Sequence, residues 1–419
     1  MFGQSPVNSF STAAQILRRD VLGRFKPGIW LISLIGFINV AGISISLPFL
    51  ALYLYQDRGV SMTLVGVILF LGGLCSAAAQ MFGGSLSDRF GRRPILFSAF
   101  AISTFLFIVM AVLIGYSAPI WTIAAVYAGA RSALVMMRPV MSAMVADLSP
   151  SDRLTETFAL LRAGQNLGWA AGPAAGGYLA ASFTYAWLFG VAALISAIAL
   201  GLVFLLLRES FDGASRWVKS QGMLSPVRDQ RFLVFTGLSL MVFLVIGQMV
   251  STLSVFIVDR AGFSTVHYGL LITVNGLGVA LFQYPMARVL GRAARSTALI
   301  LGSLLYGLGY LSMAGVGDLA IAVAAMAVIT AGDLIFLITT LSVVTELSPP
   351  NQRGQYMGFY GLSETLGLSF GPLLGGILLD SFPANPLLLW GTIAFVALLA
   401  AVGFHRWGLT QRTSQSRRL

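Results

Sequence analysis

Gly84-Ser-Leu-Ser-Asp88-Arg-Phe-Gly91-Arg-Arg93 is the stretch that decides the fold, and it lies between two long apolar segments. Charged side chains are rare and costly inside a bilayer, so Asp88 and the arginines around it mark a short turn at a membrane surface. Gly84 and Gly91 permit a close helix approach and a backbone turn that a Cβ atom would hinder. The stretch therefore predicts two membrane-spanning helices joined by a charged loop.

The composition of the whole chain agrees with a membrane protein. Of the 419 residues, 57% are hydrophobic and 10% are charged, whereas a soluble globular protein has about 25% charged residues. The expected fold class is an all-α polytopic membrane protein embedded in a lipid bilayer. Cys75, the single cysteine, lies in an apolar run. It excludes a disulfide framework and a cysteine-based metal site, and we expect it to be a buried thiol.

Twelve segments are apolar over the roughly 20 residues that a spanning helix needs. Their approximate limits are 28–55, 62–84, 94–115, 119–147, 153–181, 184–208, 231–259, 266–289, 295–315, 318–346, 352–380 and 385–407. The chain thus divides into a cytoplasmic tail at 1–27, a six-helix bundle at 28–208, a cytoplasmic linker at 209–230, a second six-helix bundle at 231–407 and a basic tail at 408–419. For the first tail, a short amphipathic helix on the membrane and a partly ordered segment are both open.

Lysine and arginine are concentrated on one side of the predicted membrane. If both termini share a side, 21 of the 26 basic residues fall in its loops and tails, whereas two, Arg58 and Arg260, fall on the other. Cytoplasmic loops carry such an excess. We therefore expect both termini in the cytoplasm and the protein in the cell membrane, with the short loops favouring a bacterial inner membrane. The same bias explains the net charge of +11 without a nucleic-acid partner.

The two groups of six spans are copies of one another. The tripeptide at 148–150 recurs at 347–349, and the pattern G-x-x-x-G-P-x-x-G-G at 168–177 recurs at 367–376, both 199 residues later. At an offset of 203 residues, Gly66, Gly73, Gln80 and Arg92 match Gly269, Gly276, Gln283 and Arg295. A duplicated six-helix unit predicts two parallel bundles related by an axis along the membrane normal.

The pattern G-x-x-x-D-R-x-G-R-R at 84–93 closely resembles the signature loop between the second and third helices of the major facilitator superfamily. The duplication fits the architecture of that family, and the resemblance covers residues 28 to about 407. It implies a secondary transporter that works by alternating access, with twelve helices in two pseudo-symmetric bundles, and we expect a monomer. Among the branches of the family, the chain is most similar to the drug:proton antiporters. That similarity implies a proton as the coupling ion, with no other cofactor.

The resemblance also implies a conformational latch in this loop. In that interpretation Asp88 meets the positive N-terminal end of the helix at 352–380, and the contact holds the cytoplasmic side shut. Arg89 and Arg92 pair with acids at neighbouring helix ends. The residues assigned to the latch are Gly84, Asp88, Arg89, Gly91, Arg92, Arg93 and Asp147. The alternative is a cytoplasmic anchor without a latch. The matching loop has Gly291 in place of the aspartate, so we expect a latch in one half only.

Three arginines lie within the predicted spans, where each should face a wet cavity or a partner. Arg131 and Arg138 are seven residues apart and hence share a helix face, and Arg162 lies in the next span. Arg131 resembles the arginine that the proton-coupled branches of the family carry at this place, which implies a role in proton coupling. The glycine that usually follows that arginine is absent here.

Asp333 and Glu364 are the two deeply placed acids. Glu364 lies about 16 Å along its helix from the inner end, near the middle of the membrane. A carboxyl group there can exchange protons as water access alternates between the two sides. Asp333, Glu364 and Arg131 are therefore candidates for proton coupling. A structural ion pair with an arginine is the alternative, and the two roles are compatible if the pair opens during transport.

The remaining site candidates come from glycines and from uncharged polar residues. The pattern at 168–177 resembles the antiporter signature of drug exporters, and it should pack closely, bend its helix and help to seal the outer end of a cavity. The residues assigned to this hinge are Gly168, Gly172, Pro173, Gly176 and Gly177. Candidates for the substrate cavity are Asn39, Arg138, Arg162, Gln165, Asn166, Gln248 and Asn275. For the uncharged members, hydrogen bonding between helices is the alternative.

The sequence shows no catalytic constellation, no metal-ligand spacing and no phosphate-binding glycine loop. We therefore expect neither enzyme activity nor ATP as the energy source. The leading hypothesis is proton-coupled efflux of small amphipathic compounds. Because three arginines face two acids within the spans, transport of an anionic metabolite or a lysolipid-like anion is the second hypothesis. A membrane receptor that transports nothing is the third, and it gives no reason for buried titratable groups.

Overall fold

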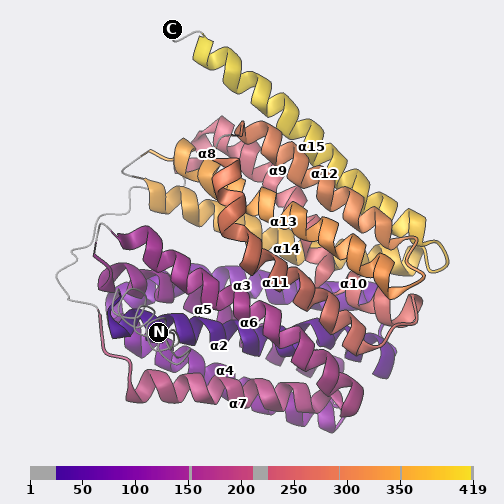
Figure 1. The fold of residues 1–419 in the computed structure, drawn as a ribbon. Coiled ribbons are helices and arrows are strands. Elements are labelled where there is room, and N and C mark those ends of the chain that lie inside the picture. The colour runs from indigo at the N-terminus through magenta and orange to yellow at the C-terminus, as the bar shows by residue number, and fades with distance from the viewer. Residues whose placement is uncertain (1–24, 151–152, 211–224, 292, 350–351, 417–419) are drawn as a thin grey trace, which may run out of the picture.

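The computed structural model describes residues 25–150, 153–210, 225–291, 293–349 and 352–416, and the regular elements in these ranges are helices (Figure 1). In the first part of the chain they are α2 (Pro27–Leu52) with a π-helical turn η3 (Tyr53–Asp57), α3 (Met62–Phe90), α4 (Arg92–Gly115), α5 (Ile120–Leu148), α6 (Leu154–Ser182) and α7 (Tyr185–Leu205). In the second part they are α8 (Ser225–Arg228), α9 (Gln230–Ile246), η5 (Gly247–Met249), α10 (Thr252–Val255), η6 (Phe256–Arg260), α11 (Thr265–Leu290), α12 (Arg295–Met313), α13 (Leu319–Leu347), α14 (Arg353–Ser381) and α15 (Pro386–Ser416).

Eleven helical rods in the described part of the chain are long and apolar enough to cross a membrane. The helix α6 is as long, with 29 residues, but it is less apolar because it carries Glu156, Arg162 and Asn166. It packs between α2 and α11, so its polar residues lie within the protein or at its aqueous ends. With α6 included, the fold is the all-α, twelve-helix membrane fold that the sequence predicted.

The helices form two halves that lie side by side (Figure 1). The first half contains α2–α7, drawn from indigo to magenta, and the second contains α9–α15, drawn from pink to yellow. The halves meet mainly along two helix pairs, α3 with α14 and α6 with α11. Matched helices start at the two offsets found in the sequence: Met62 and Thr265 are 203 residues apart, and Leu154 and Arg353 are 199 residues apart. The repeat in the sequence is therefore a repeat in the structure.

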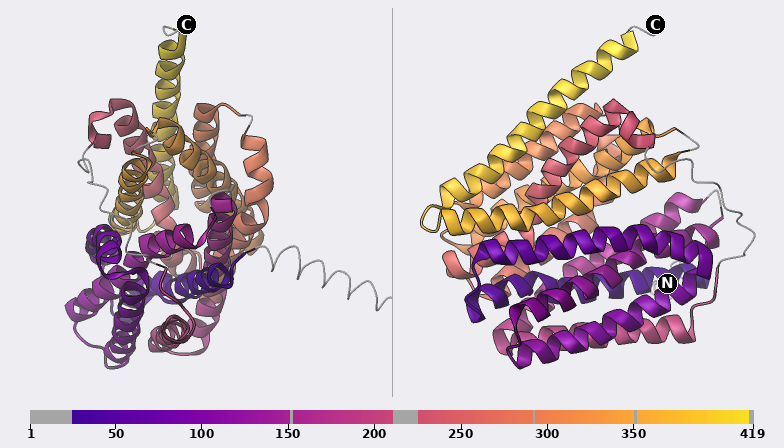
Figure 2. Two further views of the ribbon diagram at one scale, coloured as in Figure 1. Left: turned by 90° about the vertical axis from the view of Figure 1, so that its left-hand side faces the viewer. Right: turned by 180° about the vertical axis from the view of Figure 1, so that it is seen from behind.

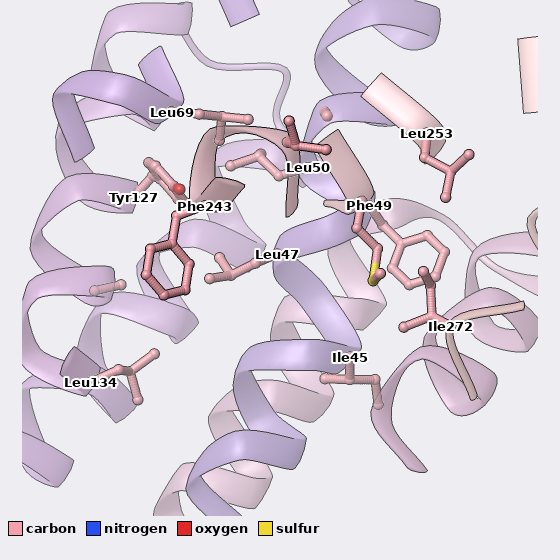
Figure 3. Packing of buried hydrophobic residues seen from close by; sticks show 14 of the residues in the cluster. Ile45, Leu47, Phe49, Leu50, Leu69, Tyr127, Leu134, Phe243, Leu253 and Ile272 are labelled. Carbon is pink, nitrogen blue, oxygen red and sulfur yellow. The ribbon is translucent and has the colours of Figure 1, made fainter. Parts of the chain in front are cut away.

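The centre of the molecule is packed with apolar side chains from both halves. Figure 3 shows this cluster, which includes Ile45, Leu47, Phe49, Leu50, Leu69, Tyr127, Leu134, Phe243, Leu253 and Ile272. These side chains come from α2, α3 and α5 on one side and from α9, α10 and α11 on the other. Lipid tails are as apolar as these residues, so the cluster stabilises the contact by close packing rather than by exclusion of water.

The first long helix of each half contains irregular turns. Both α2 and α9–α10 end in a π-helical turn, at Tyr53–Asp57 and at Phe256–Arg260, again 203 residues apart. The second rod is also broken at Gly247–Met249, where a Cβ atom on Gly247 would lie 2.9 Å from the carbonyl oxygen of Leu368. A glycine at the break allows the backbone to approach α14 there.

Two details differ from the sequence predictions, and a third prediction is not tested. The expectation of a buried Cys75 was wrong: the thiol is exposed, on the outward face of α3 beside the exposed Leu71 and Leu74. A cysteine in an apolar run can equally face lipid. The last helix does not end at 407, because α15 continues to Ser416 (Figure 2). The amphipathic helix considered for the first tail lies outside the described residues.

Candidate functional site

We use two names for the ends of the helix bundle. The linker end carries Gly91, Ser149 and Glu209, and the opposite end carries the loops at 58–61 and 261–264. At the opposite end the two halves are in close contact along both helix pairs, which we call the α6–α11 seam and the α3–α14 seam.

The α6–α11 seam is built on glycine. A Cβ atom added to Gly269 would lie 2.2 Å from the carbonyl oxygen of Pro173, and one added to Gly177 would lie 2.4 Å from that of Thr265. Such distances leave no room for a side chain, so the backbones touch directly. Thr265 Oγ1 also donates a hydrogen bond of 3.0 Å to the Gly177 carbonyl.

The α3–α14 seam repeats this arrangement at the matched residues. A Cβ atom on Gly66 would lie 2.6 Å from the carbonyl oxygen of Pro372, and one on Gly376 would lie 2.1 Å from that of Met62. This seam has an additional carboxylate. Asp380 accepts hydrogen bonds from the backbone N–H groups of Met62 (3.1 Å) and Thr63 (2.7 Å) and from the Thr63 hydroxyl (2.6 Å). The side chain of one half thus caps the first turn of a helix in the other.

Toward the linker end the tight packing stops. Each seam has a side-chain hydrogen bond near the middle of the bundle, Thr365 to Gln80 at 3.2 Å and Asn166 to Gln283 at 2.9 Å. Beyond them on α14, added Cβ atoms on Gly354, Gly358 and Gly361 would meet no atom within 4 Å among the described residues outside the backbone of their own helix. Among the described residues, the halves therefore pack tightly at the opposite end, whereas these glycines of α14 make no close contact toward the linker end.

A cavity of about 320 Å³ lies between the halves at the level where the seams end. Its walls are largely apolar, with Leu47, Leu69 and Trp169 among the lining residues. The polar lining residues are Arg131, Arg138, Asn166, Asn275, Asp333, Glu364 and Thr365. Pockets that bind small organic molecules have this composition, with an apolar wall and a few polar groups that fix orientation.

Asp333 is the most enclosed charged residue of this cavity, at 5% exposure. Tyr306 and Asn275 donate hydrogen bonds to its two carboxylate oxygens. Asn275 also donates a bond of 3.1 Å to Thr330, whose own hydroxyl donates to the Met326 carbonyl on the same helix. In the described part of the chain these partners are all uncharged, so no cation balances a charge on Asp333.

Glu364 and the two arginines of α5 have different surroundings. Arg138 Nη1 lies 4.0 Å from Glu364 Oε1, and this pair joins the two halves across the cavity. Arg131 donates a bond of 2.8 Å to the hydroxyl of Tyr127. The Arg131 Nε atom is buried and has no hydrogen-bond partner among the described residues.

Four of the predicted cavity residues do not line the cavity. Gln248 is fully buried and bonds to the carbonyls of Leu244 and Gly371 and to Thr252, because α9 is broken at this point and its freed polar groups need partners. Asn39 is buried within α2. Gln165 lies against Gly36, and Arg162 is exposed. The sequence places these residues in a helix, but it does not show which face of the helix they occupy.

The predicted hinge residues pack tightly. Added Cβ atoms on Gly168 and Gly176 would lie 2.4 Å from the carbonyl oxygens of Phe37 and Ile45 on α2. The one on Gly172 would lie 1.9 Å from Ser44 Oγ. The α6 helix is therefore pressed against α2 on one side, while Gly177 and Pro173 contact α11 on the other. Whether this segment moves as a hinge stays a prediction.

The residues of the predicted latch lie at the linker end. Arg92 is buried and pairs with Asp88 and with Asp147, at 3.2 Å from the latter. The Asp88 side chain is 68% exposed, so in this conformation it does not rest against the start of α14. Arg89 lies over the ring of Phe90. Arg93 donates to the Phe204 carbonyl on α7.

Sequence reasoning missed Glu209, which it assigned to the linker. Its two carboxylate oxygens accept hydrogen bonds from the backbone N–H groups of Arg92 (3.0 Å) and Arg93 (3.1 Å). The carboxylate therefore caps α4 from the end of α7, and a Cβ on Gly91 would lie 2.7 Å from it. Asp380 and the role of Tyr306 were also missed. Each is one ordinary residue near a helix end or in a helix, and only its distant partner reveals its role.

Comparisons with known proteins agree with this architecture. The family model described as Major Facilitator Superfamily matches residues 32–269 and 252–418. A Na(+), Li(+), K(+)/H(+) antiporter of Planococcus maritimus is 27% identical over 361 residues, which cover 78% of this chain and 83% of that protein. The quinolone resistance protein NorA of Staphylococcus aureus (strain MSSA476) is 26% identical and covers 82% and 88% of the two chains. A crystal structure of the nucleoside transporter NupG superposes with a TM-score of 0.76 at 14% identity and covers 91% and 99% of the two chains.

Proposed function

We propose that this chain, which belongs to the Major Facilitator Superfamily, is a proton-coupled antiporter that exports small amphipathic compounds by alternating access. The chain is a transporter that crosses the cell membrane several times. The direction of transport, the coupling ion and the class of substrate are the parts that we propose. We also propose that the linker end faces the cytoplasm, as the basic loops there favour.

The observation that carries the proposal is the environment of Asp333. It is an acid in the wall of the central cavity, and its partners in the described chain, Tyr306 and Asn275, are neutral. A carboxylate without a cation in such a place is best balanced by a bound proton. When the cavity opens to the other side of the membrane, that proton can leave. This makes Asp333 the preferred proton carrier of the three candidates.

Glu364 and Arg131 then have other roles. The Glu364–Arg138 pair joins the halves, and the two residues are pulled apart or brought together as the halves rock. The pair therefore links the position of the halves to the charge of the cavity. We assign Arg131 to the recognition of the substrate.

The latch belongs to the opposite half of the transport cycle. In the structure Asp88 is exposed, and Gly354 and Gly358 near the start of α14 make no close contact with other described residues. When the linker end closes, α14 approaches α3 there, and Asp88 reaches the positive N-terminal end of α14. Arg92, held by Asp147, and Glu209, which caps α4, keep the loop in position for that contact.

Proton release from proteoliposomes tests the proposal. The purified protein is reconstituted with a pH-sensitive dye inside acidified vesicles, and a solute is added outside. Ethidium, a quinolone, NaCl and KCl form the panel, because one relative is a quinolone resistance protein and another an antiporter of alkali cations. We expect ethidium or the quinolone to release protons, and Asp333→Asn to abolish the release.

Glu346→Gln is the matched control, because Glu346 lies on the same helix outside the cavity and pairs with Arg295. It should leave the proton release unchanged. Release by Na⁺ or K⁺ alone would replace drug export with cation exchange as the function. Full proton release in Asp333→Asn would remove Asp333 as the carrier.

A further inference from the structure

The cavity carries charges of opposite sign on its two walls. The first half contributes Arg131 and Arg138 from α5, and the second contributes Asp333 from α13 and Glu364 from α14. Arg138 and Glu364 pair with each other at 4.0 Å. The remaining charged groups of the lining, Arg131 and Asp333, face the cavity from opposite halves with neutral partners only among the described residues.

The guanidinium group of Arg131 has one N–H donor without a partner among the described residues. Its Nη1 donates to the Tyr127 hydroxyl, while its Nε is buried without a hydrogen-bond partner in the described chain. A buried donor without a partner is unfavourable. The guanidinium fork matches the two oxygens of a carboxylate better than it matches any neutral group. The arrangement therefore suits a ligand that brings a carboxylate.

The repeat shows that these charges are not part of the scaffold. At the offset of 199 residues that relates α5 to α13, Arg131 matches Thr330, and Asp333 matches Leu134. Both halves fold and pack alike with an uncharged residue at the matched position. Each charge is therefore specific to its own wall, as expected of groups that recognise a ligand lying between the walls.

The requirement for exchange fixes the charge at the other end of the ligand. A substrate that is exchanged against a proton at Asp333 has to compete with that proton, so it must bring a positive charge to the carboxylate. A purely anionic substrate would instead bind better when Asp333 is protonated, and it would move together with the proton. Taken with the free donor of Arg131, this points to both charges in one molecule.

We infer that the substrate is an amphipathic zwitterion, whose carboxylate binds Arg131 and whose protonated amine binds Asp333. The inference rests on the proposed exchange with protons. Between the two charges the walls are apolar, with Leu47, Leu69 and Trp169 among the lining residues. The middle of the molecule is therefore an apolar or aromatic spacer.

Calorimetric titration of the purified transporter at neutral pH tests this. The probes are two zwitterions of different length, 4-(aminomethyl)benzoate and 4′-(aminomethyl)biphenyl-4-carboxylate. For each, one analogue has the carboxylate as a methyl ester, and another has a methyl group in place of the aminomethyl group. We expect at least one zwitterion to bind more tightly than both of its analogues.

The variants assign each charge to its partner. Arg131→Gln should weaken binding of that zwitterion about 10- to 100-fold, as loss of a charge-assisted hydrogen bond does, and should leave binding of the ester unchanged. Asp333→Asn should weaken the zwitterion and the ester, but not the analogue without the amine. Arg131→Lys keeps the charge and should retain part of the affinity, and unchanged ester binding shows that Arg131→Gln is folded. Arg288→Gln, which removes a positive charge outside the cavity beside Tyr284, is the control for net charge.

Three results would overturn the inference: an ester that binds as tightly as its zwitterion, an equal loss of ester and zwitterion in Arg131→Gln, or no binding of either zwitterion at millimolar concentration. These results are independent of the proton-release experiment. Proton release by another solute without any zwitterion preference would remove this inference and leave the proposed function. Zwitterion binding with no proton release would remove the proposed exchange with protons and leave the assignment of the two charges to Arg131 and Asp333.

Discussion

The two halves of this transporter share a backbone plan and differ in their charged side chains. The contact of Gly66 with Pro372 is equivalent to that of Gly269 with Pro173, and the two contacts close the two seams in the same way. Asp380, which caps α3 in one seam, is matched in the other by Ala181, which cannot form such a cap. The glycines that set the distance between the helices are thus present in both copies, because both seams must close, whereas the aspartate cap is present in one.

The charged residues follow another rule. Asp333 has Leu134 at the matched position, and Glu364 has Gln165. A transport cycle needs one place for the proton and one for each end of a substrate, and a second copy of each would compete with the first. The comparison indicates that the glycines shared by both halves hold the scaffold and that, in the proposed mechanism, the cavity charges present in one half only carry the chemistry.

The largest expected effect comes from filling the shared contacts. Gly66→Val and Gly269→Val each place a side chain where an added Cβ would lie 2.6 Å or 2.2 Å from a carbonyl oxygen of the other half. Overpacking costs roughly 1–3 kcal/mol or more per site, so neither seam should close, and proton release in proteoliposomes should be lost in both variants. Gly190→Val, at a position with no atom within 4 Å of an added Cβ, should retain activity. Loss in one seam alone would show that the seams are not equivalent.

The arginines at the linker end give the next effect. Arg92 pairs with Asp147 at 8% side-chain exposure, and its copy Arg295 pairs with Glu346 at 31%. The hydrogen bonds of the shielded Arg92 to charged groups are worth about 1.5–3 kcal/mol, whereas an exposed pair contributes about 0–1 kcal/mol. Arg92→Met should therefore lower the temperature of thermal unfolding in detergent well below that of Arg295→Met. Equal shifts would mean that burial of Arg92 has no energetic consequence.

Removal of the cap across the α3–α14 seam should have a smaller effect. Asp380→Asn loses charge-assisted bonds to the first turn of α3 that are partly exposed to solvent, worth about 1 kcal/mol. The opposite end should open about fivefold more often. The measurement is the rate at which a maleimide added on that side labels Val279→Cys, in the lining of the cavity, with Cys75→Ser as background. Asp318→Asn is the control, because Asp318 caps the first turn of its own helix. An unchanged rate would mean that glycine packing alone holds the seam.

The smallest effect is expected from copying that cap into the other seam. Ala181→Asp places a carboxylate at the exposed position that matches Asp380, near the N-terminal end of α11. A negative charge there stabilises the contact by about 0.5 kcal/mol. Labelling of Val279→Cys from the opposite end should slow about twofold, against the direction of Asp380→Asn. Faster labelling would show that the seams differ in backbone geometry as well as in charge.

The helices and the duplication were predictable from the sequence because they depend on local or repeated properties. Span lengths follow from the thickness of a bilayer, and the loop at 84–93 carries its four charges between Asp88 and Arg93. The glycine pattern at 168–177 predicted close packing, and the structure confirms that packing against α2 and α11. The exposed Cys75 and the longer α15 were missed because an apolar run does not distinguish lipid from protein, and because a helix can continue beyond the membrane.

The site was only partly predictable. The structure places Asp333, Arg131, Arg138, Asn166, Asn275 and Glu364 in the lining of the cavity, and a polar group in an apolar helix needs a cavity or a partner. Which of the two applies depends on the rotation of each helix. The side chain of Gln248 donates a hydrogen bond to a backbone carbonyl, whereas Asn166 lines the cavity, although both are polar residues in apolar spans.

By itself, the sequence determined that this is a duplicated twelve-helix membrane protein with a charged loop at one surface and a few ionisable residues at depth, since hydropathy, spacing and repetition are properties of the linear chain. Only the tertiary structure decided that Arg138 pairs with Glu364 and that Asp333 accepts hydrogen bonds from Tyr306 and Asn275. It also decided that Arg131 Nε has no hydrogen-bond partner among the residues that the structure describes. The physical reason is that a charge is expensive in a membrane wherever it lies, but its partner is chosen by how the helices rotate and pack.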